Sequence, residues 1–278
     1  MKITMVVVLY KQRLEESKTF QTLKKTWFRQ KEHLKDIELI LYDNSLESQE
    51  FNPQDYEGIP VSYYHDPRNL GIVTAYNFAW AHAKSNKRQW LLLLDHDTEL
   101  TNAYLNEIVN LSELTHDIAA IVPKINSENT MISPVYSDTL RPLKEARPVE
   151  GIQEKPIMAI NSGALIRVSF LNQIGGFNSS FALDYLDHWL FYEIYANGNK
   201  VMVLNTTLEH ELSVMDYSRV SLERYKSIID SEMNFYRNYK NDLYSSYRTQ
   251  LGKRFLKQVL TVKNKKIAWY TLKQMLSM

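Results

Sequence analysis

The chain has 278 residues, with 33 basic and 32 acidic side chains and a formal net charge of +1. Its 44% of hydrophobic and 23% of charged residues are ordinary globular usage, which excludes disordered, collagen-like and coiled-coil proteins. The absence of cysteine excludes disulfide scaffolds, thiolate zinc sites and cysteine nucleophiles. With so little net charge, the chain is not expected to bind nucleic acid.

No run of about 18 apolar residues is present, so no membrane-spanning helix is predicted. The apolar start at residues 3–9 is too short for a signal peptide. The eight glycines form neither G-x-G-x-x-G nor G-x-x-x-x-G-K, which excludes the usual glycine-rich phosphate loops. Together with the missing cysteines, these features favour a cytoplasmic protein.

Strand and helix patterns alternate over the first half of the chain. The β-branched and leucine-rich runs predict strands at 3–9, 37–42, 61–64, 90–94 and 118–123, and the polar stretches between them predict helices at 14–33, 72–83 and 101–114. Such alternation is typical of parallel β-α-β units, whose ligands gather beyond the carboxyl ends of the strands. Polar clusters fall at three of those ends: 43–45, 66–69 and 95–97.

The second half is less regular. Prolines interrupt residues 124–156, and short strands are expected on either side of Asn161-Ser162-Gly163. A Gly175-Gly176-Phe177 turn leads to a helix that is predicted to start within 181–189 and to end near Asn197-Gly198. A strand at 200–204 follows, and the chain reads as helical from about residue 217.

Asp95-His96-Asp97 places two carboxylates just after a strand of leucines. Carboxylate oxygens suit a hard cation such as Mg²⁺ or Mn²⁺, although a solvated turn after a core strand has the same sequence. His210 follows the strand at 200–204 and is either a structural histidine or a ligand of that metal.

Asp184 and Asp187 are three residues apart, which predicts one face of a helix start. Acidic residues there either complement the helix dipole or include a general base. The Gly-Gly turn before them would let a substrate approach closely. Arg68, near Asp66, is either half of a surface pair or a contact to a base or phosphate.

Over about residues 1–211 the chain resembles family 2 glycosyltransferases of the GT-A fold, in particular bacterial rhamnosyltransferases of cell-surface polysaccharides. The order and spacing of several short motifs carry the resemblance. They are Leu9-Tyr10, Leu41-Tyr42-Asp43-Asn44-Ser45, Asn69-Leu70-Gly71 with Ala75 and Asn77, Leu94-Asp95-His96-Asp97, Asn161-Ser162-Gly163-Ala164, and Gly175-Gly176-Phe177 with Asp184-Tyr185-Leu186-Asp187. The family usually continues with E-W and an Arg, whereas this chain has His188-Trp189, with Glu193 near the Arg position.

The resemblance implies a Rossmann-like, mostly parallel α/β sheet with flanking helices and a C-terminal helical extension. A catalytic domain at 1–216 would comprise a nucleotide-sugar half (1–123) and an acceptor half (124–216), followed by basic helices at 217–278. The implied reaction is inverting transfer of a sugar, L-rhamnose from dTDP-rhamnose, to a hydroxyl of a saccharide acceptor. A donor with another dTDP- or UDP-linked sugar (glucose, galactose or an N-acetylhexosamine) is the alternative within the enzyme class. A catalytically inactive nucleotide-binding partner is the alternative outside it.

The resemblance also implies roles for individual residues. Asp187 is the expected general base, with Asp184 as the alternative. The expected nucleotide-sugar contacts are Tyr10, Asp43, Asn44, Arg68, Asn69, Gly71, Asn77, Asp95 and His96. The expected metal ligands are Asp97, Asp95 and His210, and the expected acceptor side is Ser162, Gly163, His188 and Trp189.

The charge is unevenly distributed along the chain. Residues 219–278 hold 13 basic and 4 acidic residues, and residues 1–218 hold 20 and 28. Leu251, Phe255, Val259 and Val262 recur at helical spacing among lysines, which predicts either peripheral contact with the inner face of a membrane or a helix docked on the domain. Lipid-linked acceptors, usual in the resembled family, favour the membrane. Exposed aromatic residues are expected to offer a homodimer face at Tyr236, Tyr239, Tyr244 and Tyr247.

Overall fold

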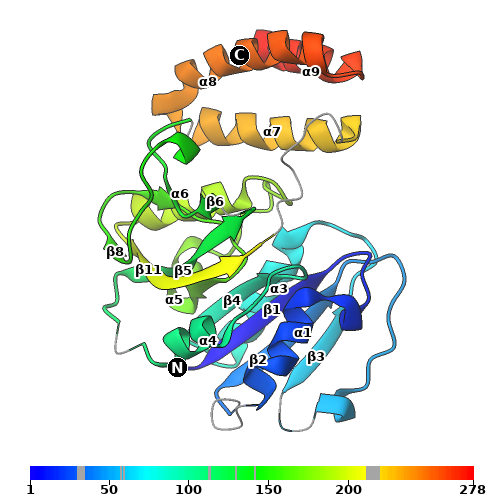
Figure 1. The fold of residues 1–278 in the computed structure, drawn as a ribbon, viewed down its shortest axis with the longest axis vertical. Helices are drawn as coiled ribbons and strands as arrows, with labels where there is room; N and C mark the ends of the chain where they lie inside the picture. Colours follow the sequence, from blue (N-terminus) through cyan, green and yellow to red (C-terminus); the bar gives the residue numbers. More distant parts are fainter. Residues whose placement is uncertain are drawn as a thin grey trace.

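The computed structural model describes residues 1–29, 35–56, 58, 60–111, 114–128, 130–140, 142–210 and 220–278. In these residues a nine-stranded sheet runs in the order β3-β2-β1-β4-β10-β5-β11-β8, with β6 paired to β5 (Figure 1). Its strands are β1 (Ile3–Leu9), β2 (Ile37–Asp43), β3 (Val61–His65), β4 (Trp90–Asp95), β5 (Ile118–Ser127), β6 (Thr130–Ser133), β8 (Gly151–Gln153), β10 (Ala164–Arg167) and β11 (Lys200–Glu209). Separately, β7 (Val135–Tyr136) pairs with β9 (Ile157–Met158).

The sheet is mostly parallel, as the alternation of strands and helices predicts. β3, β2, β1 and β4 are parallel neighbours, and β11 is parallel to β5. The short β10 lies between β4 and β5 and is antiparallel to both, so β4 and β5 point the same way. The carboxyl ends of the long strands therefore meet at one edge of the sheet.

Helices bury both faces of this sheet. On one face lie α3 (Ile72–Ser85), α5 (Val168–Ile174) and α6 (Leu186–Ala196), and on the other lie α1 (Lys18–Lys25) and α4 (Asn102–Val109). Alternate residues of β1 divide between the two hydrophobic clusters: Val6 and Val8 join the first, while Met5 and Val7 join the second. A strand covered on both faces has to be apolar throughout, which explains its unbroken hydrophobic run.

One predicted helix and one predicted helix face differ from the observed structure. The stretch predicted as helix at 14–33 contains a 3₁₀ turn at Leu14–Glu16, then α1, then a second 3₁₀ turn at Trp27–Arg29, and residues 30–34 lie outside the described part. The helix predicted to start within 181–189 does start there, at Leu186, after Tyr185, which has a left-handed backbone with φ of +64°. Asp184 thus precedes the helix, and the prediction that it shares a helix face with Asp187 is wrong.

The irregular stretch at 124–156 also contains more structure than its prolines suggest. It completes β5 and supplies β6, β7, a 3₁₀ turn at Pro142–Lys144 and β8. These strands are two to four residues long, which is too short for a periodicity to be recognised in the sequence.

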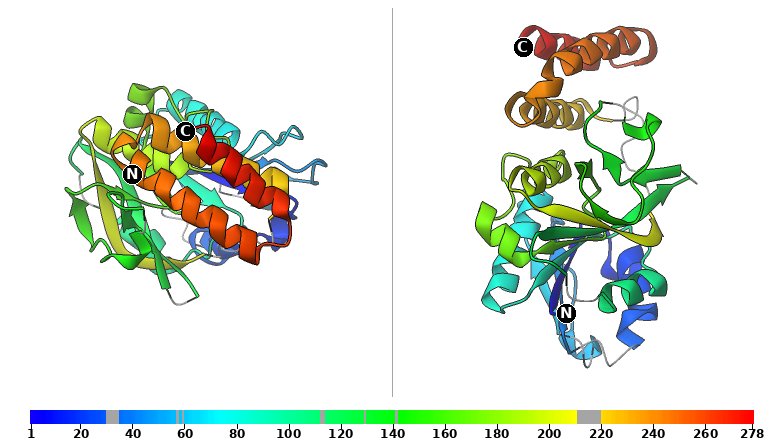
Figure 2. Two further views of the ribbon diagram at one scale, coloured as in Figure 1. Left: turned by 90° about the horizontal axis from the view of Figure 1, so that it is seen from above. Right: turned by 90° about the vertical axis from the view of Figure 1, so that its left-hand side faces the viewer.

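Three helices, α7 (Leu222–Asn238), α8 (Asn241–Thr261) and α9 (Lys265–Leu276), form a layer beyond α6 at one end of the molecule, with α8 and α9 side by side (Figures 1 and 2). Buried polar side chains join all three: the Gln258 Nε2 donates to the Tyr225 hydroxyl (2.7 Å), which bonds Thr271 (2.6 Å). The domain boundary predicted at 216/217 lies outside the described residues. Within the described ranges, no helix is both long and apolar enough to cross a membrane.

The C-terminal tyrosines do not form the exposed surface expected of a dimer face. Tyr236 and Tyr247 are buried and stack on one another with ring centroids 4.4 Å apart, and Tyr239 and Tyr244 are half-buried. The prediction that these aromatic residues are exposed is wrong, since α7 and α8 turn them toward α6 and toward each other.

Candidate active site

Backbone pairing at the end of β11 positions His210 next to the Asp95-His96-Asp97 segment. The His210 N–H donates to the Asn126 carbonyl (3.0 Å), which continues the pairing of β11 with β5. Beside it, Glu99 bridges Glu209. These pairings bring the ends of β4 and β11 together, although more than 100 residues separate them in the sequence.

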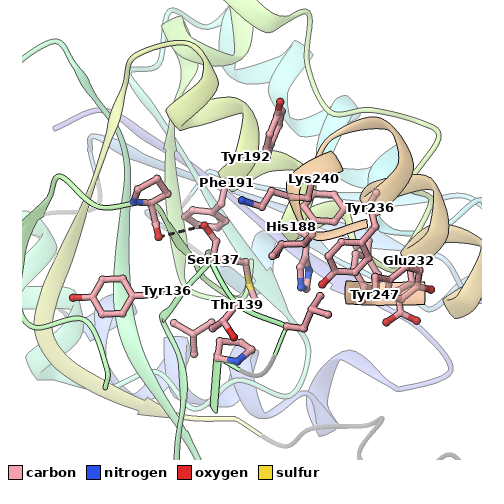
Figure 3. A pocket seen from close by; sticks show the side chains of 18 of the residues that line it. Tyr136, Ser137, Thr139, His188, Phe191, Tyr192, Glu232, Tyr236, Lys240 and Tyr247 are labelled. Carbon is pink, nitrogen blue, oxygen red and sulfur yellow. Dashed lines mark hydrogen bonds between the residues drawn. The ribbon is translucent and has the colours of Figure 1, made fainter. Parts of the chain in front are cut away.

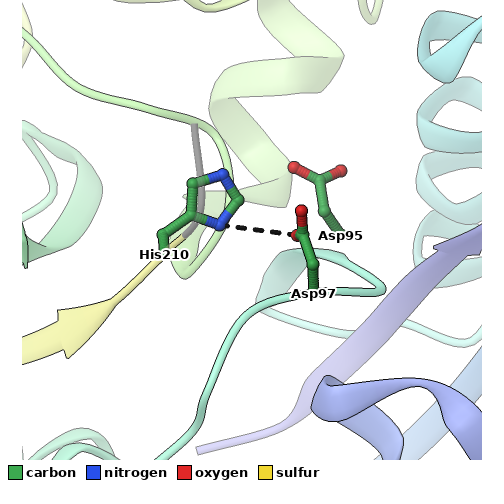
Figure 4. A group of neighbouring side chains, drawn as sticks. All are labelled: Asp95, Asp97 and His210. Atoms are coloured by element: carbon green, nitrogen blue, oxygen red, sulfur yellow. Dashed lines mark ion pairs between the residues drawn. The ribbon is translucent and has the colours of Figure 1, made fainter. Parts of the chain in front are cut away.

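Asp95, Asp97 and His210 form a group that could hold a metal ion (Figure 4). One potential ligand atom from each residue lies within 4.8 Å of the others, and the His210 Nδ1 is 3.5 Å from the Asp97 Oδ1. That oxygen is buried and accepts no hydrogen bond from any described residue. Burial, and next the charge of Asp97, raise the pKa of Asp95 to about 6. A bound cation would offset the repulsion between these two carboxylates. Two carboxylates and an imidazole suit Mn²⁺, or Mg²⁺ through the carboxylates, so the residues fit the expected metal.

Buried hydroxyls hold this loop in place. The Asp95 N–H donates to the Ser162 Oγ (3.0 Å), and the Ser162 and Thr98 hydroxyls bond each other. The neighbouring Gly163 carbonyl accepts from the Tyr104 hydroxyl (2.6 Å). Ser162 and Gly163, which were expected on the acceptor side, are both buried under the loop, where they support it.

Asp187 lies in the first turn of α6. Its Oδ1 accepts hydrogen bonds from the His188 N–H (2.8 Å) and from the His188 Nδ1 (3.0 Å). Burial alone would raise the pKa of Asp187, but the charge of His188 and these hydrogen bonds outweigh it and lower that pKa. The carboxylate is therefore held in its ionised form, which is the form that accepts a proton.

Tyr76 on α3 is buried near the two candidate catalytic carboxylates, Asp95 and Asp187. Its side chain is fully buried, and its hydroxyl has no hydrogen-bond partner among the residues described. Burial raises its pKa most, followed by the charges of Asp95 and Asp187. Tyr76 is thus near enough to both carboxylates to feel their charges. The sequence motifs did not single it out, because its only signal is the unspecified position between Ala75 and Asn77.

Asp184, the alternative base, is engaged elsewhere. Both of its oxygens accept hydrogen bonds from the Arg224 guanidinium, one of them at 2.6 Å, and Ser227 donates at 3.3 Å. Arg224 and Ser227 belong to α7, so Asp184 fastens the segment before α6 to the C-terminal helices.

The polar residues after β2 and β3 are held by protein contacts. Asp43 accepts from the Ser45 N–H (2.9 Å), the Gln49 Nε2 (2.8 Å) and the Tyr63 hydroxyl (2.8 Å). The buried Asn44 leaves its Oδ1 without a partner in the described part of the chain.

Arg68 donates to both oxygens of Asp66 at 2.8 and 2.7 Å, and its hydrogen bonds hold the pKa of that carboxyl well below its usual range. Even so, the Arg68 side chain is 64% exposed. The exposed side of its guanidinium group is therefore accessible to a ligand while the pair with Asp66 is kept.

Two glycines in the resembled motifs lie so close to other parts of the protein that a side chain would not fit there. Gly71 has φ of +88°, and a Cβ there would lie 2.1 Å from the Ala182 carbonyl oxygen. At Gly176, a Cβ would lie 2.4 Å from the Trp80 ring and 2.6 Å from the Asn77 Oδ1. The close approach expected of a substrate at the Gly-Gly turn is therefore made by Trp80 and Asn77.

The remaining predicted residues differ in their surroundings. Asn77 holds the Phe177 backbone through both its N–H (2.8 Å) and its carbonyl (2.9 Å), and Trp189 is buried in the core. Tyr10 is 39% exposed at the end of β1, Asn69 is an exposed residue with φ of +47°, and His96 is half-buried.

A family model described as "Glycosyl transferase family 2" matches residues 6–175, well over half of the chain. The chain belongs to glycosyl transferase family 2. It is therefore a nucleotide-sugar glycosyltransferase, and its α/β sheet with flanking and C-terminal helices is a GT-A-like fold. No curated protein matches it.

Solved structures resemble this glycosyltransferase in fold. TarS 1–349 of S. aureus is 14% identical with a TM-score of 0.51, over 100% of this chain and 88% of TarS 1–349. Its complex with UDP-GlcNAc is similar (14% identity, TM-score 0.51, 99% of this chain and 80% of that one). The mannosyltransferase PcManGT from Pyrobaculum calidifontis, in complex with GDP-Man and Mn²⁺, is 14% identical with a TM-score of 0.59. That match covers 85% of this chain and 64% of PcManGT, so the chain spans less than two thirds of its length.

Proposed function

We propose that this glycosyltransferase moves L-rhamnose from dTDP-rhamnose to a hydroxyl of a saccharide acceptor, with inversion at the anomeric carbon. The observation that carries the proposal is the ionised Asp187 at the start of α6, close enough to the Asp95-Asp97-His210 group for its charge to contribute to the raised pKa of Asp95. A base is thus available on one side of the metal group, where an acceptor hydroxyl has to be deprotonated.

In this proposal Asp187 takes the proton of the acceptor hydroxyl, whose oxygen attacks the anomeric carbon opposite the leaving nucleoside diphosphate. A Mg²⁺ or Mn²⁺ ion held by Asp95, Asp97 and His210 would supply the positive charge that the departing diphosphate needs. Asp43 and Arg68 would hold the base end of the donor, and Asp95 would reach the ribose or support the metal. The division of labour follows the predicted domains, with 1–123 for the donor, 124–216 for the acceptor and 217–278 as a helical extension.

The sugar itself rests on the resemblance of the 175–177 and 184–187 segments to those of rhamnosyltransferases. UDP-GlcNAc and GDP-Man in the two similar structures support a nucleotide-sugar donor without selecting rhamnose. Purified protein with Mn²⁺ should release nucleoside diphosphate from dTDP-rhamnose faster than from UDP-glucose, UDP-galactose or UDP-GlcNAc, and a chelator should stop the release. Faster release from one of the UDP-sugars would show that this sugar nucleotide, and not dTDP-rhamnose, is the donor. Absence of thermal stabilisation by any of these donors would contradict the function itself.

We also propose that α8 and α9 contact an anionic membrane surface on the cytoplasmic side, where a lipid-linked acceptor would be presented. Leu251 and Val262 are buried, so the hairpin is docked on the molecule. The opposite face nevertheless exposes large apolar side chains, and residues 243–278 contain eight basic and no acidic residues. The exposed apolar residues are Leu256, Val259, Leu260, Trp269 and Leu276. Lysines with exposed apolar residues are typical of helices that lie on anionic bilayers.

Liposome co-sedimentation tests this contact. The full chain should sediment with vesicles that contain phosphatidylglycerol and remain in solution with pure phosphatidylcholine. A Leu260→Ser/Trp269→Ser variant should lose most of the binding, while Leu143→Ser, on an exposed leucine distant in sequence, should keep it. If the wild-type chain stays in the supernatant with anionic vesicles, the membrane contact is wrong.

A further inference from the structure

A cavity of about 430 Å³ lies between α6, the helices α7 and α8, and the β7–β9 region (Figure 3). Its volume falls within the range of about 300–1,000 Å³ that is usual for small-molecule sites. The helical part of its wall comes from residues after 175, beyond the segment that matches the family model. The helical part of the wall is therefore built by the predicted acceptor half and the C-terminal helices.

The cavity adjoins the candidate base. His188 lines it, and the same ring bonds the Asp187 carboxylate at 3.0 Å through Nδ1. Tyr185, two residues before Asp187, also lines it and stacks on His188 with centroids 4.3 Å apart. A ligand in the cavity would thus contact the residue next to the proposed proton acceptor.

The lining combines aromatic rings with unsatisfied hydroxyls. Tyr236 and Tyr247 line it as a stacked pair, and Tyr192 and Phe235 add further rings. The hydroxyls of Tyr195 and Tyr247 are buried and make no well-formed hydrogen bond within the described ranges, although the Ile157 backbone lies near the first and Glu232 near the second. Buried polar groups in native proteins are nearly always paired, so these two hydroxyls point to a ligand that can donate or accept hydrogen bonds.

Each acidic, lysine or arginine side chain in the wall has a partner of opposite charge, although one of these partners lies outside the lining. Glu232 on α7 and Arg254 on α8 form a two-pronged pair at 2.7 and 2.9 Å, with side chains only 8% and 17% exposed. Lys240 also lines the cavity and lies 3.3 Å from Asp242, which is outside the lining. A wall without excess charge does not select a diphosphate, and its buried hydroxyls and ion pair do not suit a hydrocarbon chain. It suits a neutral ligand that has both apolar faces and hydroxyl groups.

We propose that this cavity is a subsite for a pyranose ring of the acceptor saccharide. The inference rests on the proposed function and names the substrate class of its acceptor side. The aromatic rings would cover the apolar faces of the sugar, while Tyr195, Tyr247 and the Glu232–Arg254 pair would bond its hydroxyls. Acceptor choice would then be encoded by α6, α7 and α8, and donor choice by the edge of the sheet.

Saturation-transfer NMR on the full-length protein tests the subsite without any reaction. The probes are the methyl pyranosides of rhamnose, glucose, galactose and N-acetylglucosamine at millimolar concentration, with decanoate as the apolar comparison. At least one pyranoside should bind, and a Tyr195→Phe/Tyr247→Phe variant should weaken that binding about tenfold, since it removes two hydrogen-bonding groups. Ala196→Trp, which adds a large ring at an exposed lining position, should also weaken it. Tyr270→Phe, which removes a hydroxyl that bonds Asp230 away from the cavity, should leave it unchanged.

Three outcomes would overturn the subsite: no pyranoside binds the wild-type protein, decanoate binds in place of the pyranosides, or the double phenylalanine variant binds as the wild type does. The double variant retains both rings, so it keeps the test decisive if Ala196→Trp does not fold. The binding of UDP and dTDP with Mn²⁺, measured on the same samples, tests the donor site separately. If the wild-type protein binds a pyranoside but neither nucleotide, the proposed function is contradicted. If it binds a nucleotide but no pyranoside, only the subsite is contradicted.

Discussion

The His210 Nδ1 lies 3.5 Å from the Asp97 Oδ1, a buried oxygen that accepts no hydrogen bond in the described part of the chain. The contact joins the loop after β4 to the end of β11, two segments that are far apart in the sequence. His210 follows residue 175, where the match to the family model ends. This histidine therefore completes a metal group whose two aspartates lie within the matched segment.

His210→Ala should weaken Mn²⁺ binding by about tenfold or more. Changing even a group that only supports a ligand costs about 10–100-fold in affinity, and we propose His210 as a ligand itself. Titration followed by electron paramagnetic resonance of free Mn²⁺ measures the change. His82→Ala removes a half-exposed histidine at the far end of α3 and should have no effect. Equal affinities in the two variants would exclude His210 from the metal site.

Asp187→Asn and Asp184→Asn should differ in what they damage. The first removes the proposed base, so transfer should fall by about 10²–10⁴-fold while the melting temperature changes little. The second leaves Arg224 without its carboxylate partner, so the free energy of unfolding should fall by about 1–3 kcal/mol while transfer per folded molecule is retained. Turnover with the purified donor and thermal unfolding of the same samples distinguish the two. The opposite pattern would make Asp184 the base.

The architecture of the sheet could be predicted because it depends on local sequence. Strands such as β1 and β4 are buried on both faces, and the resulting apolar runs are visible without any tertiary information. The polar residues at their carboxyl ends could be grouped for the same reason, since parallel strands end at one edge.

Features that depend on one backbone angle or on packing could not be predicted in this way. The left-handed conformation of Tyr185 delays the start of α6 and separates Asp184 from Asp187. The inward orientation of Tyr236 and Tyr247 depends on how α7 and α8 pack against α6. Hydrophobic periodicity describes each helix alone and does not say which neighbour covers it.

The Asp66–Arg68 pair should make part of the stability depend on pH. Because the hydrogen bonds from Arg68 lower the folded-state pKa of Asp66, the ionised carboxylate stabilises the fold above the unfolded pKa of about 4, and this contribution is lost as the pH falls toward the lower folded pKa. In urea unfolding, the stability difference between the wild type and Asp66→Asn should therefore be larger at pH 6 than at pH 3. A difference that stays constant over this range would contradict the assignment.

Gly176→Ala should destabilise the protein more than Gly175→Ala. Both glycines have positive φ, so a Cβ at either position costs about 1–2 kcal/mol in backbone strain. Only at position 176 would the Cβ also meet the Trp80 ring and the Asn77 side chain, which adds about 1–3 kcal/mol because Asn77 is fixed by two bonds to Phe177. At position 175 no atom lies within 4 Å of the added carbon. The urea midpoints of both variants measure the loss of stability. Equal losses in the two variants would show that Trp80 and Asn77 move aside for the extra methyl group without cost.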